Sequence, residues 1–503
     1  MKTVKVTHFS VPFLWIALLV ATIFTRFYDI ELKPIHFDES INGWFVMQMA
    51  KLGYYKYDPN NYHGPLYFYL LQGFEYVWGT SLTILRAVPA VFSVLCVMIF
   101  TFGILSSSAV QRWMIFFLFL SPAFLFFGRS GIHEMPFVFF QIVFSLGVLR
   151  WFEKPDSKAI ALGLVGLWGM TTLKETFAVF LFAWTLALLS LGARGLREFF
   201  AKEKWKQAWT SRVTILFALL LVLFVQLFTG FFKNGAGLVD FVKAFLPWMK
   251  TGVHGNGHDK EFAYWLKVLW EAEPLVLFGI LFAVKGVFAK DKALRVLSVF
   301  SLTQFLVYSL IPYKTVWCIL SLVWGFYFVL AYSCVELARS RFAKYATWVL
   351  IGALAALGVR SAYLSVYKHP LWFEHPYVYV NSTEDLVLVQ NTLLQEAQKR
   401  PELLQELVQV GMKEQWPWPW VLRSFTHVRY DLCAKTVFQG AAAYFCEMPE
   451  SLAVDNLLSE PYWKIKVTLR QSREPSVVYL KKSIFTAEAF PEAEVVGVGE
   501  FIK

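Results

Sequence analysis

The sequence has few charged residues. Asp, Glu, Lys and Arg make up 17% of the 503 residues, well below the quarter that is usual for soluble domains. Hydrophobic residues make up 57% and aromatic residues 18%. A water-soluble protein does not have this balance, whereas a polytopic membrane protein requires it. The scarcity of charge therefore excludes an ordinary soluble enzyme.

The patterns of nucleic-acid-binding proteins are also missing. The formal net charge of +11 would by itself be compatible with a nucleic-acid partner. However, the sequence contains no zinc-finger spacing, no basic helix and no aromatic–basic RNA-binding pattern. Its Lys and Arg residues stand largely in short loops between apolar segments, where they set membrane topology. We therefore expect no nucleic acid among the partners.

Cysteine is scarce, with five residues and no CxxC or Cys/His metal-binding pattern. Cys96, Cys318 and Cys334 lie in apolar segments and are expected to be packing residues. Cys433 and Cys446 lie in the polar C-terminal part of the chain. They could form a disulfide that closes a short loop if this part faces an oxidising compartment.

What the sequence has instead is a series of apolar runs that are long enough, or nearly long enough, to span a bilayer. The first follows Met1–Lys5 in the manner of a signal anchor, and we find no convincing cleavage site after it, so it is kept as a span. The runs predict eleven transmembrane helices, at about 11–30, 81–105, 112–128, 135–152, 158–173, 176–193, 213–232, 273–289, 295–312, 315–335 and 346–363.

The loop charges predict the orientation. If Lys2 and Lys5 lie inside, every inside loop is basic, as the positive-inside rule requires. The loop 194–212 is the most basic, with six Lys or Arg residues; the other inside cations are Arg112, Lys154, Lys158, Lys285, Lys290, Lys292, Arg295, Arg339, Arg341 and Lys344. We therefore predict a multi-pass protein of the cell's inner (plasma) membrane, with a cytoplasmic N-terminus and an extracytoplasmic C-terminal domain.

Two regions lie outside the spans. The first outer loop, about 31–80, holds two amphipathic stretches, 41–49 and 66–74, that predict helices lying in the membrane interface. From His375 onward the chain is polar, with strand-like runs at 377–380, 386–389, 477–480 and 494–498 and a helical stretch at 401–413. This predicts a transmembrane domain, 1–370, followed by a small soluble α/β domain, 371–503. Its Trp416, Trp418, Trp420 and Trp463 would be core residues or sugar-stacking residues.

Asp38 and Glu39 directly follow the first span. In one interpretation Asp38 caps the following helix and Glu39 favours its positive end. In another, a carboxylate at the boundary between water and lipid acts as a general base toward an acceptor hydroxyl or amine. A divalent metal held by oxygen ligands is a further alternative, although one acidic pair is few ligands for it.

Several cations fall on the predicted outer face, against the general bias of basic residues to the inside. Lys174 lies in the turn Lys174-Glu175. It either forms an ion pair within this turn or offers a point charge to a phosphate. The same reasoning covers Lys314, which follows Tyr313, and Arg129 and Arg360 could add to it. Cations outside need an anionic partner, and the phosphate of a lipid-linked sugar would be one.

Histidines accompany these turns. His133-Glu134 opens the fourth span. Glu134 either stabilises the positive end of that helix or is a second functional carboxylate on the same face as Asp38. His63 could position a substrate, although a lone histidine is more often structural. His254 and His258 stand in a glycine-rich stretch, which indicates a substrate loop more than a metal site.

Four short phrases in a fixed order add a family resemblance. They are His63-Gly64-Pro65-Leu66, Leu173-Lys174-Glu175-Thr176-Phe177, Ile311-Pro312-Tyr313-Lys314-Thr315 and His375-Pro376-Tyr377-Val378-Tyr379-Val380. With the Asp-Glu loop and the charged outer turns, the chain resembles the GT-C fold and the protein mannosyltransferase and aminoarabinose transferase superfamily (glycosyltransferase family 39-like). Within it, the phrases are similar to a bacterial and archaeal flippase-activity-associated, glycosyltransferase-like group. The resemblance covers about residues 20–440.

The resemblance implies an inverting transferase with a polyprenyl-phosphate sugar as donor. Asp38 would be the catalytic base with Glu39 beside it, Glu134 would support the acceptor or donor site, and Lys174 would meet the donor phosphate. The chain departs from the family in one place, since an Arg commonly precedes the second-turn carboxylate and His133 stands there instead. Metal dependence varies in the superfamily, so a divalent metal is possible and no cofactor is certain.

These observations favour a membrane glycosyltransferase whose acceptor is a glycan, a lipid or a protein. The alternative is a factor that translocates lipid-linked sugars without chemistry of its own. A transporter is expected to carry charges deep in its spans, whereas most charges here cluster at one face. A third interpretation is a binding protein whose C-terminal domain recognises a glycan or a partner.

Overall fold

The structure of the protein is a computed structural model that describes residues 11–61, 63–253, 258–338, 341–471 and 475–497. The predictions made for Lys2, Lys5, His254 and Arg339 lie outside these residues. The chain divides into two compact units. One contains the described residues up to Ile30 together with Val46–Tyr377, and the other contains Glu31–Phe45 together with the described residues from Val378 onward.

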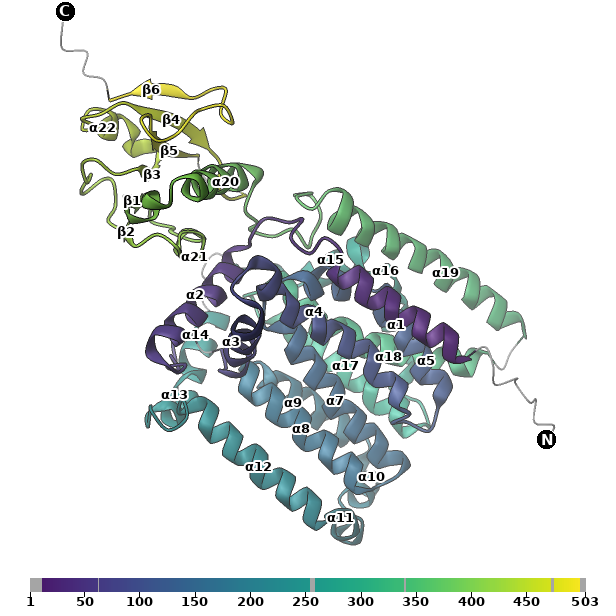
Figure 1. The fold of residues 1–503 in the computed structure, drawn as a ribbon. Coiled ribbons are helices and arrows are strands. Elements are labelled where there is room, and N and C mark those ends of the chain that lie inside the picture. Colours follow the sequence, from purple (N-terminus) through teal and green to yellow (C-terminus); the bar gives the residue numbers. More distant parts are fainter. Residues whose placement is uncertain (1–10, 62, 254–257, 339–340, 472–474, 498–503) are drawn as a thin grey trace, which may run out of the picture. The chain divides into compact units, whose positions relative to one another are not determined.

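The first unit is helical (Figure 1). Its principal helices are α1 (Val11–Phe27), α3 (Leu66–Trp78), α4 (Leu82–Met98), α5 (Ser108–Leu120), α6 (Pro122–Phe126), α7 (Glu134–Glu153), α8 (Ser157–Leu173), α9 (Phe177–Leu189), α10 (Gly192–Phe199), α11 (Lys202–Ala208), α12 (Ser211–Phe228), α13 (Gly237–Lys243), α14 (Phe245–Val253), α15 (Tyr264–Ala272), α16 (Pro274–Gly286), α17 (Lys292–Leu310), α18 (Ile319–Leu337) and α19 (Arg341–Tyr363). Short 3-10 segments, η1 (Ile99–Phe102), η2 (Phe127–Arg129) and η3 (Val316–Cys318), extend α4, α6 and α18, and a π-helical segment, η4 (Leu364–Lys368), extends α19.

All eleven segments predicted to span the membrane are helical over most of their length. Among the described residues, six helices are long and apolar enough to cross a bilayer, and up to eight if each of two bent pairs counts as one span. The helices within 16–27, 157–173 and 274–286 are apolar but shorter. The number of spans therefore stays a prediction, while the helical class of the unit is confirmed.

Small residues set the spacing of α7 and α8. A Cβ atom added to Gly166 would lie 2.5 Å from the backbone nitrogen of Phe144, and one on Gly147 would lie 2.7 Å from that of Gly163. Backbones at this distance leave no room for a side chain, as is usual where membrane helices pack closely. The two helices are consecutive and antiparallel, so the start of α7 and the end of α8 lie at the same end of the unit.

The two helices predicted in the first outer loop are present. They are α2 (Phe37–Leu52) and α3. The first two turns of α2 bury polar residues, since Glu39, Ser40 and Asn42 are at most 5% exposed. Phe37, Trp44 and other residues of the opposite face are only half-buried. Apart from Asp38, the less buried side of this start of α2 is thus apolar, the reverse of a soluble amphipathic helix.

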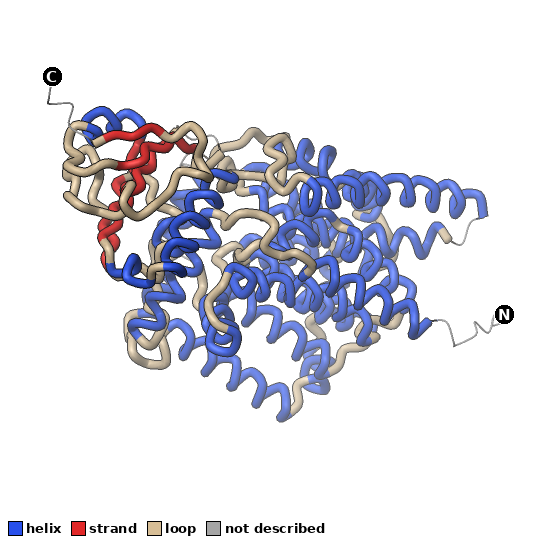
Figure 2. Tube along the Cα trace, turned by 45° about the horizontal axis from the view of Figure 1, so that its top comes forward, coloured by secondary structure: helices blue, strands red, loops and turns tan. Residues whose placement is uncertain are grey.

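The second unit contains a mixed sheet of six strands in the order β2-β1-β3-β5-β4-β6. The strands are β1 (Leu407–Gly411), β2 (His427–Arg429), β3 (Ala443–Glu447), β4 (Tyr462–Val467), β5 (Ser476–Lys481) and β6 (Glu494–Val496). β1 pairs in parallel with β2 and with β3. β5 pairs antiparallel with β3 and with β4, and β4 pairs antiparallel with β6. Figure 2 shows strands only among these residues. The expected small α/β domain is confirmed.

A disulfide joins Cys433 to Cys446 on β3. It lies in a core cluster with Tyr444, Tyr462 and Tyr479. Trp418 and Trp420 are also buried, at 1% and 3% exposure, which agrees with their interpretation as core residues.

Three secondary-structure predictions for this unit were wrong. Residues 386–389 belong to helix α20 (Glu384–Lys399), where Leu386, Val389, Leu393 and Ala397 are buried at helical spacing. Taken alone, the continuous apolar run Leu-Val-Leu-Val resembles a buried strand, but the helical spacing over the longer segment decides. The predicted helix at 401–413 is a 3-10 turn followed by the strand β1, and the expected strand at 377–380 is a loop. In both cases the periodicity of a short apolar run does not by itself decide its secondary structure, which depends on the segments that pack against it.

Candidate active site

Three segments of the helical unit meet at the end of α8: the loop before α3, the start of α7 and the turn Lys174-Glu175. The loop before α3 lies directly on this helix end, because the N–H of Gly64 donates to the carbonyl of Leu173 at 2.9 Å. A Cβ atom at Gly64 would be 2.2 Å from the carbonyl oxygen of Thr172, so this approach requires glycine. The next residue back, His63, contacts the Glu175 carboxylate through Nδ1 at 3.2 Å.

Lys174 and Glu134 form a buried ion pair in the same place. The Lys174 ammonium contacts Glu134 Oε1, and the two residues are 6% and 4% exposed. Burial by itself lowers the pKa of Lys174, but the nearby Glu134 and Glu175 carboxylates outweigh it and hold that pKa well above its usual value. Lys174 is therefore charged at any physiological pH, and Glu134 neutralises it.

His133 lies next to this pair. Its ring is 4.7 Å from that of His63 and 4.2 Å from that of Tyr67, measured between centroids. Burial, assisted by His63 and Lys174, lowers the pKa of His133 well below its usual value, so the ring is neutral at pH 7. Its Nε2 atom is buried and has no hydrogen-bond partner within the described residues. Buried polar atoms are rarely left unpaired, which marks this atom as one that can receive a ligand.

A small cavity of about 10 Å³ adjoins Lys174 and Glu175. Four of the residues that line it are aromatic; the lining residues are Tyr57, Gly64, Thr171, Lys174, Glu175, Phe228, Phe241, Ala244 and Phe245. Burial and the Glu175 carboxylate raise the pKa of Tyr57, which stays a phenol. The cavity has the size of about one water molecule, so a larger ligand at Lys174 requires these aromatic side chains to move.

The turn that holds Tyr313 and Lys314 pairs with the segment 258–260. The backbone N–H of Lys314 donates to the His258 carbonyl at 3.1 Å, and Lys260 N–H donates to the Pro312 carbonyl at 3.0 Å. The Lys314 ammonium donates to the carbonyls of Lys260 and Ile311, at 3.0 and 2.6 Å. Burial lowers the pKa of Lys314. These two acceptors are neutral, and the nearby Asp259 carboxylate acts on Lys314 in the opposite direction to burial.

Arg129 has a different set of partners. Its guanidinium donates to the carbonyls of Thr25, Arg26, Tyr28 and Asp29, at distances of 2.6 to 3.3 Å. These carbonyls end α1 and would otherwise lack donors. These contacts make Arg129 a cap of the first helix. The phosphate-binding role that the sequence suggested for it stays a prediction.

In the second unit, the start of α2 holds Asp38 and Glu39. Glu39 is fully buried, and its carboxylate accepts the N–H of His36 at 2.8 Å. His36 Nδ1 in turn accepts the N–H of Asp38 at 3.1 Å. These two bonds form a reciprocal cap in which histidine replaces the usual Ser or Thr. The helix start is therefore capped by His36 and Glu39, while the Asp38 side chain stays 34% exposed.

Further residues of this unit surround the start of α2. The Arg470 guanidinium lies 4.1 Å above the Phe37 ring, and Trp416 makes edge contacts with Phe37 and Trp44 at centroid distances of 6.4 and 5.8 Å. A Cβ atom at Gly43 would fall 2.3 Å from the Trp420 ring. Sequence reasoning did not connect these residues with Asp38, because they lie more than 370 positions away.

Sequence reasoning also missed Glu273, which lies between α15 and α16. Its carboxylate is 1% exposed and accepts from Ser121 Oγ at 2.8 Å, from the N–H of Ala123 at 2.6 Å and from the Tyr327 and Tyr377 hydroxyls. A carboxylate with four donors is a structural junction. Its only sequence signal is an acidic residue directly before an apolar run.

Within the ranges that the structure describes, no three His, Cys, Asp or Glu side chains are grouped as metal ligands. His258 packs its ring on Tyr313, with centroids 5.4 Å apart, and His254, which was considered with it, lies outside those ranges.

No protein-family model matches the chain, and no curated protein matches it by sequence. Its structure, however, is similar to crystal structures of ArnT from Cupriavidus metallidurans. ArnT bound to undecaprenyl phosphate matches with a TM-score of 0.65 at 13% identity, over 95% of this chain and 100% of that chain. Apo ArnT matches with a TM-score of 0.63 at 14% identity and the same coverage. The chain has the GT-C fold.

The GT-C fold is the one that the four sequence phrases indicated, so that prediction is confirmed. With its long apolar helices, this GT-C protein is a multi-pass membrane protein. At 13% and 14% identity the likeness is one of fold, and the chemistry has to be argued from the residues of this chain.

Proposed function

We propose that the protein is an inverting glycosyltransferase that moves a sugar from a polyprenyl-phosphate donor to an acceptor on the extracytoplasmic face. The observation that carries the proposal is the buried group of Lys174, Glu134 and His133 where three segments meet. Support comes from the fold, which this chain shares with a protein crystallised with undecaprenyl phosphate.

The donor phosphate would be bound by Lys174 and His133. Lys174 supplies a permanent charge, and a neutral His133 with its proton on Nε2 would donate to a phosphate oxygen. In this role His133 replaces the arginine that commonly stands in the related transferases. Lys314, whose ammonium donates to two carbonyls, would add a second positive charge. Cations at a departing phosphate stabilise the charge that develops on it.

Asp38 would act as the general base. An acceptor hydroxyl attacks the anomeric carbon from the face opposite the phosphate, and the bond from that carbon to the phosphate oxygen breaks. The polyprenyl phosphate leaves with the electron pair and needs no proton, while the hydroxyl proton passes to Asp38. One base and a set of cations are sufficient for this reaction.

The two neighbours of Asp38 would position it. Burial lowers the pKa of His36, against the opposing effect of Asp38 and Glu39. A neutral ring with its proton on Nε2 fits both contacts, since Nε2 donates to the Tyr379 carbonyl at 2.9 Å and Nδ1 accepts from Asp38 N–H. His36 and Glu39 then fix the backbone of Asp38, whose partly exposed carboxylate lies 3.7 Å from His36 Nδ1 and would accept the proton.

The substrates are identified first, by mass spectrometry of envelope glycans and glycoproteins from cells that lack the protein. A missing sugar gives the donor and the acceptor together. Purified Asp38→Asn is then assayed with these substrates. We expect transfer to fall about 10²- to 10⁴-fold, the usual contribution of a general base, with binding of the donor unchanged.

Asp58→Asn is the matched control, because Asp58 is an exposed carboxylate of the same loop and should leave transfer unaltered. Transfer by Asp38→Asn at the wild-type rate would refute the role of Asp38. If cells lacking the protein lose translocation of labelled donor while no transfer is found, the alternative of a translocation factor holds instead.

A further inference from the structure

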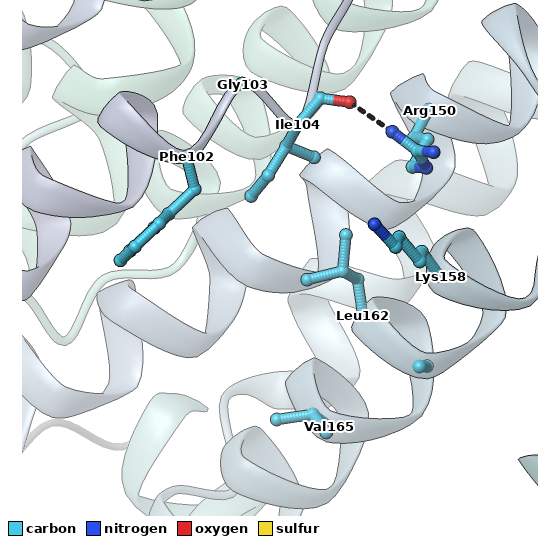
Figure 3. Close-up of a pocket in the computed structure, with 8 residues that line it drawn as sticks. Phe102, Gly103, Ile104, Arg150, Lys158, Leu162 and Val165 are labelled. Atoms are coloured by element: carbon cyan, nitrogen blue, oxygen red, sulfur yellow. Dashed lines mark hydrogen bonds between the residues drawn. The ribbon is translucent and has the colours of Figure 1, made fainter. Parts of the chain in front are cut away.

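We propose that the helical unit has a second lipid site, which binds the phosphate headgroup of a membrane lipid at the other end of α7 and α8. A cavity of about 370 Å³ lies there. Figure 3 shows it between η1, the end of α7 and the start of α8, lined by Phe102, Gly103, Ile104, Arg150, Lys158, Ala161, Leu162 and Val165. This volume falls within the range of small-molecule pockets.

The charge of the cavity comes from Lys158. Arg150 also lines it, but its guanidinium is already bound to the Asp156 carboxylate, through Nε at 2.9 Å, and to the Ile104 carbonyl through Nη1 at 2.7 Å. Within the described ranges no acidic residue lines the cavity, and Glu153, the other nearby carboxylate, points its Oε2 to the N–H of Ser106 at 2.7 Å. Lys158 is exposed and has no ion pair among the described residues. Lys158 is therefore the lining cation without an acidic partner, which suits a phosphate.

The walls are apolar and continue away from that charge. Ala161, Leu162 and Val165 follow Lys158 at helical spacing, so they extend from it along one face of α8. Phe102 stands on the opposite side of the opening and is 67% exposed. A charge at one end and a hydrocarbon surface beyond it fit a phosphate that carries an acyl or prenyl chain, and they do not favour a small soluble anion.

The position of the cavity separates it from the candidate active site. Glu134 is the first residue of α7, and Arg150 is near its last turn. At 1.5 Å per residue, the helix places about 24 Å between them, so the cavity and the Glu134–Lys174 pair lie near opposite membrane faces. The predicted topology assigns the cavity to the cytoplasmic leaflet, where basic pockets between membrane helices commonly bind lipid headgroups. Lipid binding in this cavity requires no transferase activity.

The test uses native mass spectrometry of the full-length protein after delipidation. Phosphatidylglycerol, undecaprenyl phosphate and the zwitterionic phosphatidylcholine are added separately, and inorganic phosphate is added as a competitor. We expect one of the two anionic lipids to bind at least tenfold more tightly than phosphatidylcholine, with no competition by millimolar phosphate. The preferred anionic lipid identifies the source of the headgroup.

Two variants localise the binding. Lys158→Ala removes the charge and Leu162→Trp fills the apolar part, and each should weaken anionic lipid binding about tenfold or more. Lys158→Arg should retain it, and Lys154→Ala, an exposed lysine that does not line the cavity, should have no effect. Wild-type binding by both Lys158→Ala and Leu162→Trp, or equal binding of phosphatidylglycerol, undecaprenyl phosphate and phosphatidylcholine, would overturn the proposal. Thermal melting of each variant confirms that it is folded.

Discussion

The charges around Lys174 determine what this residue can bind. Its ammonium is paired with Glu134, and the adjacent Glu175 contacts His63. The two carboxylates and one ammonium of these residues add up to one excess negative charge. A donor phosphate is therefore accommodated only if additional cations contribute. This is the physical reason for including Lys314 in the proposed donor site.

The ion pair itself can be tested by a double-mutant cycle. Lys174→Met leaves Glu134 as a buried, unpaired carboxylate, so we expect it to lower the free energy of unfolding by about 3–5 kcal/mol. Lys174→Met combined with Glu134→Leu should recover most of this loss, because no buried charge remains. Thermal unfolding in detergent measures both effects. A double variant as unstable as the single one would show that the pair is not the cause.

The residues of the candidate site were largely predictable, whereas their partners were not. Apolar runs and loop charges placed Lys174, Glu134 and His63 in turns on one face, and the structure brings these three together. The sequence suggested that Lys174 could pair with its neighbour Glu175, but it pairs with Glu134, 40 positions away. Which turns meet depends on helix packing, which a single sequence does not display.

At the scale of the element, the start of α2 is built for a fixed geometry. Its buried side is polar and internally bonded, with Glu39 accepting from His36 and His36 accepting from Asp38. The sequence interpretation assigned the cap to Asp38. In the structure the capping groups are its two neighbours, so a helix cap and an available carboxylate coexist within four residues.

This cap predicts a contrast between two substitutions of Glu39. Glu39→Ala removes the acceptor for the His36 N–H and should destabilise the helix start by about 0.5–2 kcal/mol. Glu39→Gln keeps an oxygen in that place, as in the usual capping box, and should cost much less. Hydrogen exchange of the amides of residues 37–41 reports the difference. Equal exchange rates in the two variants would contradict the capping role.

The helices and the strands differ in how far the sequence predicted them. A membrane helix is specified by its own length and hydropathy, so all eleven predicted segments were helical. In the soluble unit, Leu386–Val389 was mistaken for a strand and 401–413 for a helix. Short apolar runs take their structure from the neighbours they pack against, such as the two parallel partners of β1.

At the scale of the whole molecule, both units bury histidines in the neutral form. Burial lowers the pKa of His36, of His133 and of His375, the last to about 4. An unfolded histidine binds a proton near pH 6.5. Between the two values the unfolded chain holds more protons than the folded chain, so the free energy of unfolding decreases as the pH falls.

His375 gives this effect a measurable window. Lowering the pH from about 6.5 to 4 should remove up to about 3 kcal/mol of stability through this residue. His375→Asn, which can still accept the Tyr377 N–H that now bonds to Nδ1 at 3.2 Å, should make thermal unfolding less sensitive to acid. The exposed His427 is the matched control, and His427→Asn should leave the pH dependence unchanged. An unaltered slope in His375→Asn would contradict the assignment.

The glycines between α7 and α8 have a consequence for how this protein tolerates sequence change. Gly147 lies well away from Glu134 along α7, and Gly166 lies well away from Lys174 along α8. Both glycines nevertheless fix how close the two backbones come. A single methyl group at either position would push the helices apart and shift Lys174 relative to Glu134. Natural variants at these glycines should therefore impair the protein as severely as changes to its charged residues, although they lie far from any substrate.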